Sequence, residues 1–317
     1  MKNKFLKNWA KKSLAIIAAF AMAVGCQKDD KSINEVSGSN DPNLVRLGVP
    51  EFSQEYLKSI VPLKPAEYQE NIAKYRADLN NVASRQVMQA ALPTSYNLPS
   101  LPIGNQGNEG SCVGFGVGYA AHSITRYINN TVHQSSWSGA LRSAAYVYNQ
   151  IKISNCASGS YPQTAMDLLV NKGECSNSQM PYVNGGCYTA PTAQQNTWAS
   201  QRKISGWKNI SATNVDDIKY YLSQKYPVPV CFDYNQSFSD IQNNGYVWSQ
   251  VYGQRTGGHC VCIVGYDDVN QRFKVANSWG SSWGISGYFY VTYGAVQSGA
   301  FNWAAVMFPN LNSNTPQ

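Results

Sequence analysis

Charged side chains are scarce in this sequence of 317 residues. Asp, Glu, Lys and Arg make up 14% of the chain, whereas hydrophobic residues make up 43%. A disordered chain has the opposite balance, with few hydrophobic residues and a high net charge. The scarcity of charge therefore excludes a largely disordered protein, and the length allows one or two domains with a sizeable core.

Acidic residues are absent from the first 26 positions, and this absence distorts the net charge of +7. Five lysines near the start contribute +5 to this net charge: Lys2, Lys4, Lys7, Lys11 and Lys12. The rest of the chain is therefore almost neutral. A basic surface is the electrostatic mark of a nucleic-acid-binding protein, so we expect no nucleic-acid partner.

The sequence also lacks an apolar run long enough to span a bilayer as a helix. The run at 14–24 is too short, and its position after a basic start is typical of a secretory signal. Residues 23–26 resemble a bacterial lipobox, in which Cys26 receives a lipid and becomes the mature N-terminus. We therefore expect 1–25 to be a lipoprotein signal peptide. The alternative is an ordinary secretory signal in which Cys26 is incidental.

We expect residues 26–91 to comprise a tether and, after it, a possible pro-segment with an amphipathic helix. A polar stretch at 27–43 is followed by a predicted amphipathic helix that opens at Pro65, a residue suited to a first turn. Its apolar stripe consists of Tyr68, Ile72, Tyr75, Leu79 and Val82. The stripe must be buried, and the downstream domain is the obvious partner. Two interpretations stay open, namely a pro-segment that covers an active site farther along the chain and a structural stalk.

The rest of the chain, 92–317, changes from helical to sheet-rich character. After a Pro- and Gly-rich stretch at 92–110, the sequence predicts helices from Cys112, over 140–152 and 163–171, and from 215 to just before Pro227. It then predicts strands over 228–232, 259–266, 272–276 and 288–293. A helical half at about 105–200 therefore precedes a β-rich half at about 201–308, which places the domain in the α+β class.

Eight cysteines divide by their surroundings. We assign Cys26 to lipid and Cys112 to chemistry, and the other six allow 15 complete pairings. Three lie in loop-like surroundings where one bridge is expected, because an exported protein meets oxidising conditions: Cys156, Cys175 and Cys187. Three lie in strand-like runs and are expected to be buried thiols: Cys231, Cys260 and Cys262.

Histidine is the rarest of the catalytic residue types here, with only His122, His133 and His259. Cys112 begins a helix, where free N–H groups and a partial positive charge favour a thiolate nucleophile. His122 is ten residues along that same helix and cannot fold back onto Cys112. His133 lies in a polar loop without an evident partner. His259 begins a predicted strand, which makes it the candidate base.

Three further residues would complete such a site. The amide oxygen of Asn277 can accept the second ring N–H of His259 and fix the orientation of the ring. Trp279 would then shield that bond from water. Gln106 lies on a Gly-rich loop six residues before Cys112, and its side-chain NH2 could form an oxyanion hole with the backbone N–H of Cys112.

With these residues in place, the chain resembles the papain family of cysteine peptidases over about 92–308. The resemblance rests on four blocks in order: Asn105-Gln106-Gly107, Gly110-Ser111-Cys112, Gly258-His259 and Asn277-Ser278-Trp279-Gly280, the last followed by Trp283-Gly284 and Gly287-Tyr288. The sequence departs from the family pattern at Glu109, where many members carry a disulfide cysteine, at Val113, where many carry Trp, and at Ser160, which replaces a usual Gly.

The resemblance implies a papain-like two-domain fold, with a helical half, a β-barrel-like half and the active site in the cleft between them. It implies hydrolysis of peptide bonds through a thioester, with Cys112 as nucleophile, His259 as base and acid, Asn277 as orienting residue and Gln106 as oxyanion-hole donor. The residues it implies for substrate binding are Gly159, Ser160, Tyr161, Pro162, Cys231, Gly258, Cys260 and Trp279. Pro162, Cys231 and Cys260 would line an apolar pocket for the second substrate residue before the scissile bond (P2).

The implied partners are a peptide or protein substrate and the membrane that holds the lipid, and the cleft could also take a proteinaceous inhibitor. No metal and no organic cofactor is expected. The expected location is outside the cytoplasm, on a bacterial and most simply the outer membrane, facing the periplasm or the cell surface. Two alternatives stay open: a catalytically silent papain-like module that binds peptides, and an acyl-transferase or amidase that uses the same residues.

Overall fold

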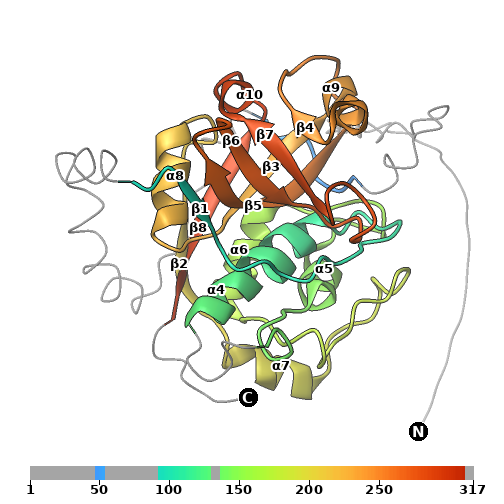
Figure 1. The fold of residues 1–317 in the computed structure, drawn as a ribbon. Coiled ribbons are helices and arrows are strands. Elements are labelled where there is room, and N and C mark those ends of the chain that lie inside the picture. Colours follow the sequence, from blue (N-terminus) through green and yellow to red (C-terminus); the bar gives the residue numbers. More distant parts are fainter. Residues whose placement is uncertain (1–46, 54–91, 130–135, 311–317) are drawn as a thin grey trace, which may run out of the picture. The chain divides into compact units, whose positions relative to one another are not determined.

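A layer of helices packs against a mixed β-sheet in the computed structural model of the protein (Figure 1). The structure describes residues 47–53, 92–129 and 136–310. The expected signal peptide, Cys26, the amphipathic helix that opens at Pro65, and His133 lie outside these residues. No helix in the described part of the chain is both long and apolar enough to cross a membrane.

The helices predicted from Cys112, over 140–152 and 163–171, and from 215 are present in the structure. The bounds of the helices in the described residues are η2 Gly114–His122, α4 Ser123–Asn129, α5 Ala144–Ile151, α6 Pro162–Asn171, α7 Ala193–Ser200, α8 Val215–Ser223, α9 Gln236–Ser239, η3 Asp240–Asn244 and α10 Tyr293–Gln297. Asn214 caps α8 as predicted, because its side chain accepts a hydrogen bond from Asp217 N. Helix α5 begins later than predicted, because the Ser143 side chain caps it at that point.

Helix α7 was not predicted from the sequence. Thr192 and Gln195 form a capping box at its start, in which each side chain binds the backbone of the other residue. Only one residue of the helix, Ala199, is fully buried. The hydrophobic period that reveals most helices is therefore missing from α7, and the capping box is the signal that could have identified it.

In the described part of the chain the sheet has eight strands, and β5 lies near its centre. The bounds are β1 Ser95–Asn97, β2 Ile204–Asn209, β3 Val228–Tyr234, β4 Val247–Trp248, β5 Gly257–Asp267, β6 Arg272–Ala276, β7 Tyr288–Thr292 and β8 Trp303–Pro309. The strand order is β2-β8-β3-β5-β6-β7-β4, with β1 paired to β5. The four predicted strands are confirmed as β3, β5, β6 and β7, whereas β2 and β8 were not predicted.

The α+β class is confirmed, but the sheet is not closed. In the described part of the chain the strand order begins at β2 and ends at β4, and no pairing joins these two edges. The β-rich half is therefore an open sheet and not a closed barrel. The β2 edge pairs only with β8, near the end of the described chain.

The helix that begins at Cys112 continues into η2, whose hydrogen bonds have π-helical spacing, and then into α4. All nine residues of η2 are buried. A side chain at Gly116 would press on the Cys260 Sγ atom of β5, with the added Cβ only 2.9 Å from the sulfur. The absence of a side chain at Gly116 therefore lets this helix approach the central strand closely.

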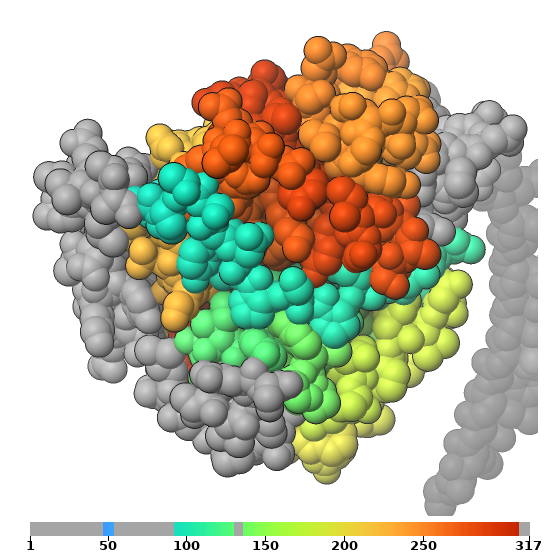
Figure 2. Space-filling view, viewed as in Figure 1, coloured from blue at the N-terminus to red at the C-terminus, as the bar shows by residue number. Residues whose placement is uncertain are grey.

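The segment 92–110 crosses between the two halves on the face shown in Figure 2, with the strands above it and the helices below. Its first part is held by β1, where Tyr96 pairs with Tyr266 of β5. Its last part reaches the start of the Cys112 helix. The predicted loop is thus a connection that is tied to both halves.

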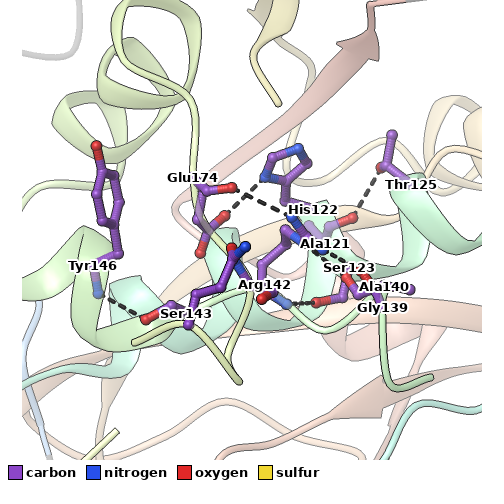
Figure 3. Close-up of polar contacts among 12 residues, drawn as sticks. Ala121, His122, Ser123, Thr125, Gly139, Ala140, Arg142, Ser143, Tyr146 and Glu174 are labelled. Carbon is purple, nitrogen blue, oxygen red and sulfur yellow. Dashed lines mark hydrogen bonds and ion pairs between the residues drawn. The ribbon is translucent and has the colours of Figure 1, made fainter. Parts of the chain in front are cut away.

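A buried cluster of charged groups supports the helical half (Figure 3). The Nδ1 atom of His122 lies 2.8 Å from Glu174 Oε2, and both side chains are almost completely buried. Arg142 is also fully buried and donates through Nε to Ala140 O at 2.9 Å, while its Nη2 donates to Gly139 O. His122 is therefore part of the helical core and not of the active site.

Burial controls the protonation of this cluster. It lowers the pKa of His122 well below the usual value, and the positive charges of Arg142, Arg126 and Arg202 lower it further. Burial raises the pKa of Glu174 well above the usual value, while Arg142 opposes that shift. His122 is thus held neutral, and its contact with Glu174 is a buried hydrogen bond that contains one proton.

Replacing Glu174 by Ala should destabilise the protein by about 1–3 kcal/mol, because it leaves the buried His122 without its hydrogen-bond partner. The measurement is the free energy of unfolding from chemical denaturation. Asp216→Ala, at an exposed position in the first turn of α8, is the matched control and should cost no more than about 1 kcal/mol. Equal losses in the two variants would contradict a structural role for the cluster.

Candidate active site

Cys112 lies at the start of the long helix and is completely buried. Backbone groups of Cys260, Gly48 and Val113 lie close enough to its sulfur to lower the pKa of the thiol against the larger effect of burial. Cys260 directly follows His259, so the sulfur of the helical half reaches the strand that carries the predicted base. The structure thus brings together two positions that lie almost 150 residues apart in the sequence.

His259 is fixed by the residues that the sequence analysis assigned to it. Its Nε2 atom lies 2.8 Å from Asn277 Oδ1, and the same oxygen accepts the N–H of Ser278 at 2.8 Å. Because that backbone donor identifies the acceptor as the amide oxygen, Nε2 of His259 must carry the proton. In the neutral ring, Nδ1 is then the nitrogen that can accept a proton.

Aromatic rings enclose the imidazole. The centroid of the Trp279 ring lies 4.8 Å from that of His259, and Phe232 meets the imidazole edge-on at 5.5 Å. His259, Asn277 and Trp279 are all buried. Trp279 therefore lies against the imidazole, where it was predicted to shield the His259–Asn277 bond from water.

Gln106 is held in place from both of its amide atoms. Its Nε2 donates to Glu109 O at 2.9 Å, and its Oε1 accepts the hydroxyl of Ser278 at 2.6 Å. The backbone N–H of Gln106 also donates to Ser278 O at 2.9 Å. Ser278, which the sequence analysis did not single out, therefore joins the loop before Cys112 to the block that contains Asn277.

Glu109 anchors this loop where many papain-like sequences carry a disulfide cysteine. Its carboxylate accepts the N–H of Cys187 at 3.2 Å and the hydroxyl of Tyr182 at 2.8 Å. Cys187 forms a disulfide with Cys156, which confirms the prediction of one bridge in this region. At this position, hydrogen bonds to a buried carboxylate thus tie the loop to Cys187 and Tyr182. Cys175, Cys231, Cys260 and Cys262 are buried free thiols.

Residues 47–53 lie across the residues predicted to bind substrate (blue in Figure 1). Ser160 N donates to Gly48 O at 2.8 Å on the helical side. Gly48 N and Val49 N both donate to Gly258 O on the β side, at 2.9 and 3.0 Å. The backbone groups expected to hold a substrate peptide on both sides therefore hold the chain's own segment.

Side chains add to this contact. Phe52 packs against Tyr161 with ring centroids 6.2 Å apart. Arg255 donates through Nη2 to Val49 O at 3.0 Å and through Nε to Asp233 at 2.9 Å. The segment is thereby bound through both its backbone and its side chains. Neither its position nor the role of Arg255 could be inferred from the sequence, because the local pattern at 47–53 carries no signal.

The covering of the site governs the state of Cys112. Burial raises the pKa of the Cys112 thiol, and the neighbouring Cys260 raises it further, while the backbone hydrogen bonds from Cys260, Gly48 and Val113 oppose the rise. In the covered arrangement the sulfur is a neutral thiol. Removing the cover would remove part of the burial that dominates this shift.

Of the other residues predicted for substrate binding, Pro162 begins α6, and Cys231 lies opposite Cys260 in the pairing of β3 with β5. Cys231, Cys260 and Pro162 are buried. Cys231 and Cys260 thus lie on paired strands beside His259, whereas Pro162 belongs to the helical half.

Comparison with known proteins agrees with this arrangement. The family model described as papain family cysteine protease matches residues 95–307. A peptidase C1-like protein of Acanthamoeba polyphaga mimivirus is 29% identical over 203 residues, which are 60% of this chain and 63% of that protein. Cysteine proteinase 3 of Dictyostelium discoideum is 26% identical, over 60% of this chain and 55% of that protein. The chain thus spans less than two thirds of these relatives.

Solved structures show the same fold. Xylellain, a cysteine protease from Xylella fastidiosa, superposes with a TM-score of 0.63 at 22% identity, over 83% of this chain and 96% of that one. The digestive procathepsin L2 proteinase of Tenebrio molitor superposes with a TM-score of 0.59 at 24% identity, over 85% of this chain and 80% of that one.

Proposed function

Because the chain belongs to the papain family of cysteine proteases, we propose that it is a cysteine peptidase in which Cys112 and His259 hydrolyse peptide bonds. The observation that carries this proposal is the contact between the Cys112 sulfur and the backbone of Cys260, next to an imidazole that Asn277 orients. A nucleophile, a base and an orienting residue therefore meet at one junction, as covalent acyl transfer requires.

The proposed reaction has two stages. His259 takes the proton of Cys112, and the thiolate attacks the substrate carbonyl. The Gln106 amide and the Cys112 backbone N–H stabilise the oxyanion that develops, and His259 then protonates the leaving amine. Water, deprotonated by His259, attacks the resulting thioester and releases the carboxylic acid. Gln106 suits this role because Ser278 and Glu109 already hold its amide in place.

We propose an apolar preference for the P2 side chain. Cys231 and Cys260 are completely buried thiols on neighbouring strands, and Pro162 is buried on the helical side. A pocket with these walls offers no charged partner, so a charged P2 group would lose its hydration without compensation.

Replacing Cys112 by Ala should abolish hydrolysis of peptides with Leu or Phe at P2, because no other residue can form the thioester. The measurement is the rate of product release, with the unfolding free energy as a control for the fold. The matched control is Cys262→Ala, another buried thiol, which should retain activity. Activity that survives in Cys112→Ala would contradict the peptidase assignment. A wild-type chain that is inert even when uncovered would favour the silent peptide-binding module.

We further propose that residues 47–53 are an inhibitory pro-segment, one of the two interpretations of the N-terminal region. The segment takes up the hydrogen bonds of Ser160 and Gly258 and lies against the Cys112 sulfur. Bound in this way, it competes directly with substrate. Cleavage or displacement of the segment would then activate the enzyme.

Gly48→Ala should raise the peptidase rate of the full chain. A Cβ at Gly48 would overlap the backbone of Gly110, and overpacking of this kind costs about 1–3 kcal/mol. That cost shifts the covered–uncovered equilibrium by roughly 5- to 150-fold. The measurement is the initial rate of hydrolysis of a peptide substrate.

The matched control for that substitution is Gly294→Ala in α10, where an added Cβ meets no atom within 4 Å. It should leave the rate unchanged. An unchanged rate in a folded Gly48→Ala chain would show that the segment does not limit access to Cys112.

We also propose that the protein is exported and anchored through a lipid on Cys26, on the strength of the lipobox-like residues 23–26. Cys26→Ser should move the protein from the membrane fraction to the soluble fraction of a bacterial host, because the lipid supplies the hydrophobic attachment. Fractionation followed by mass spectrometry of the mature N-terminus measures this. An unlipidated wild-type chain in the soluble fraction would favour the ordinary secretory signal.

A further inference from the structure

Two thiols near the nucleophile take no part in the chemical steps proposed for peptide hydrolysis. Cys231 of β3 and Cys260 of β5 are directly opposite each other in the antiparallel register. Opposite residues in such a pair have Cα atoms about 4.5–5.5 Å apart, which lies inside the range of about 4.4–6.8 Å that a disulfide spans. The two thiols are also close enough for Cys260 to raise the pKa of Cys231. Both are free and completely buried.

Cys260 also adjoins the helix of the nucleophile. Its Sγ atom lies against Gly116, one helical turn after Cys112. Its backbone also lies close to the Cys112 sulfur. Cys260 therefore contacts the nucleophile's helix and, through its side chain, Cys231.

The next buried thiol along β5 differs in this respect. Cys262 has Pro229 opposite it on β3 and Ala276 opposite it on β6. It therefore has no thiol directly across the sheet on either side. Burial alone does not distinguish Cys231 and Cys260, but their register does.

We propose that Cys260 and Cys231 form a thiol relay that returns an oxidised Cys112 to its active, reduced state. The proposal rests on the proposed role of Cys112 as nucleophile, since an uncovered thiolate of this kind is the thiol most readily oxidised by a hydroperoxide. It assigns Cys231 and Cys260 a redox function in addition to their place in the substrate pocket.

The relay has three steps. The Cys112 thiolate attacks a hydroperoxide, the O–O bond breaks, the alcohol leaves after taking up a proton, and Cys112 becomes a sulfenic acid. The Cys260 thiol then displaces that hydroxyl as water and forms a Cys112–Cys260 disulfide. Finally Cys231, after losing its proton, attacks the Cys260 sulfur, and Cys112 leaves as a thiolate.

The balance closes without a further reactant. One hydroperoxide is reduced to one alcohol and one water, and the thiols of Cys231 and Cys260 are oxidised to one disulfide. An external dithiol would reset the pair. Without the relay, a second oxidation would convert Cys112 to a sulfinic acid, which thiols do not reduce.

The test uses the full chain with Gly48→Ala as the parent, reduced and then freed of reductant. The concentration of hydrogen peroxide is raised until a fixed fraction of the parent has reacted. Every variant then receives that same concentration. Free thiols are then alkylated and the peptides mapped by mass spectrometry. The expected result is a Cys231–Cys260 linked peptide together with alkylated, and therefore reduced, Cys112.

Three variants of this parent separate the steps. With Cys231→Ala the reaction should stop at a Cys112–Cys260 link. With Cys260→Ala no link should form, and the sulfinic acid at Cys112 should increase several-fold. With Cys112→Ala the Cys231–Cys260 link should be largely lost. Cys262→Ala, the matched control, should behave as the parent.

An equal yield of the Cys231–Cys260 link without Cys112 would show direct oxidation and overturn the relay. The relay would also be overturned if Cys112 were oxidised in the parent without formation of any disulfide. It would likewise be overturned if Cys260→Ala left the amount of sulfinic acid at Cys112 unchanged. Peptide hydrolysis by the untreated chain is measured separately. A chain that forms the links but does not hydrolyse peptides would contradict the proposed function and leave the relay standing.

Discussion

The close approach of the Cys112 helix to strand β5 is the constraint on which the site depends. Gly116 provides it, because any side chain there would collide with Cys260. This approach places the sulfur of one half against the backbone next to His259 in the other. Hydrogen bonds between Gln106 and Ser278 then lock the two halves together beside the sulfur. Positions of catalytic groups are thus set by packing rather than by any local conformation.

The junction between the Cys112 helix and strand β5 explains both the inhibited state and the peptide hydrolysis that we propose. When residues 47–53 bind Ser160 and Gly258, the Cys112 sulfur is excluded from water, and its pKa rises for that reason. A buried neutral thiol is a poor nucleophile and a poor target for oxidants. Uncovering the cleft would therefore increase peptidase reactivity and vulnerability to oxidation together. The neighbouring thiols of Cys231 and Cys260 would reverse that oxidation through the proposed relay.

Where local signals were strong, the sequence predicted the structure well. Helix α8 follows from the Asn214 cap, α6 agrees with the predicted helix over 163–171 to within one residue, and strand β6 agrees residue for residue with the expected range. Asn277 as the partner of His259 was likewise predicted. Strands β2 and β8 were missed, because a strand is stabilised by its neighbours in the sheet and these two pair chiefly with each other across almost 100 residues. The buried Arg142 was missed because an arginine is normally exposed.

The sequence by itself determined the α+β class, and it predicted the residues of the proposed site in a helical and a β-rich half. These properties reside in short motifs, caps and periodic patterns that each act over a few residues. Only the tertiary structure decided that Glu109 would hold Cys187, that Cys231 would face Cys260, and that residues 47–53 would cover Cys112. Such pairings depend on register and on packing between distant segments, and the free energy that selects them is shared among many contacts.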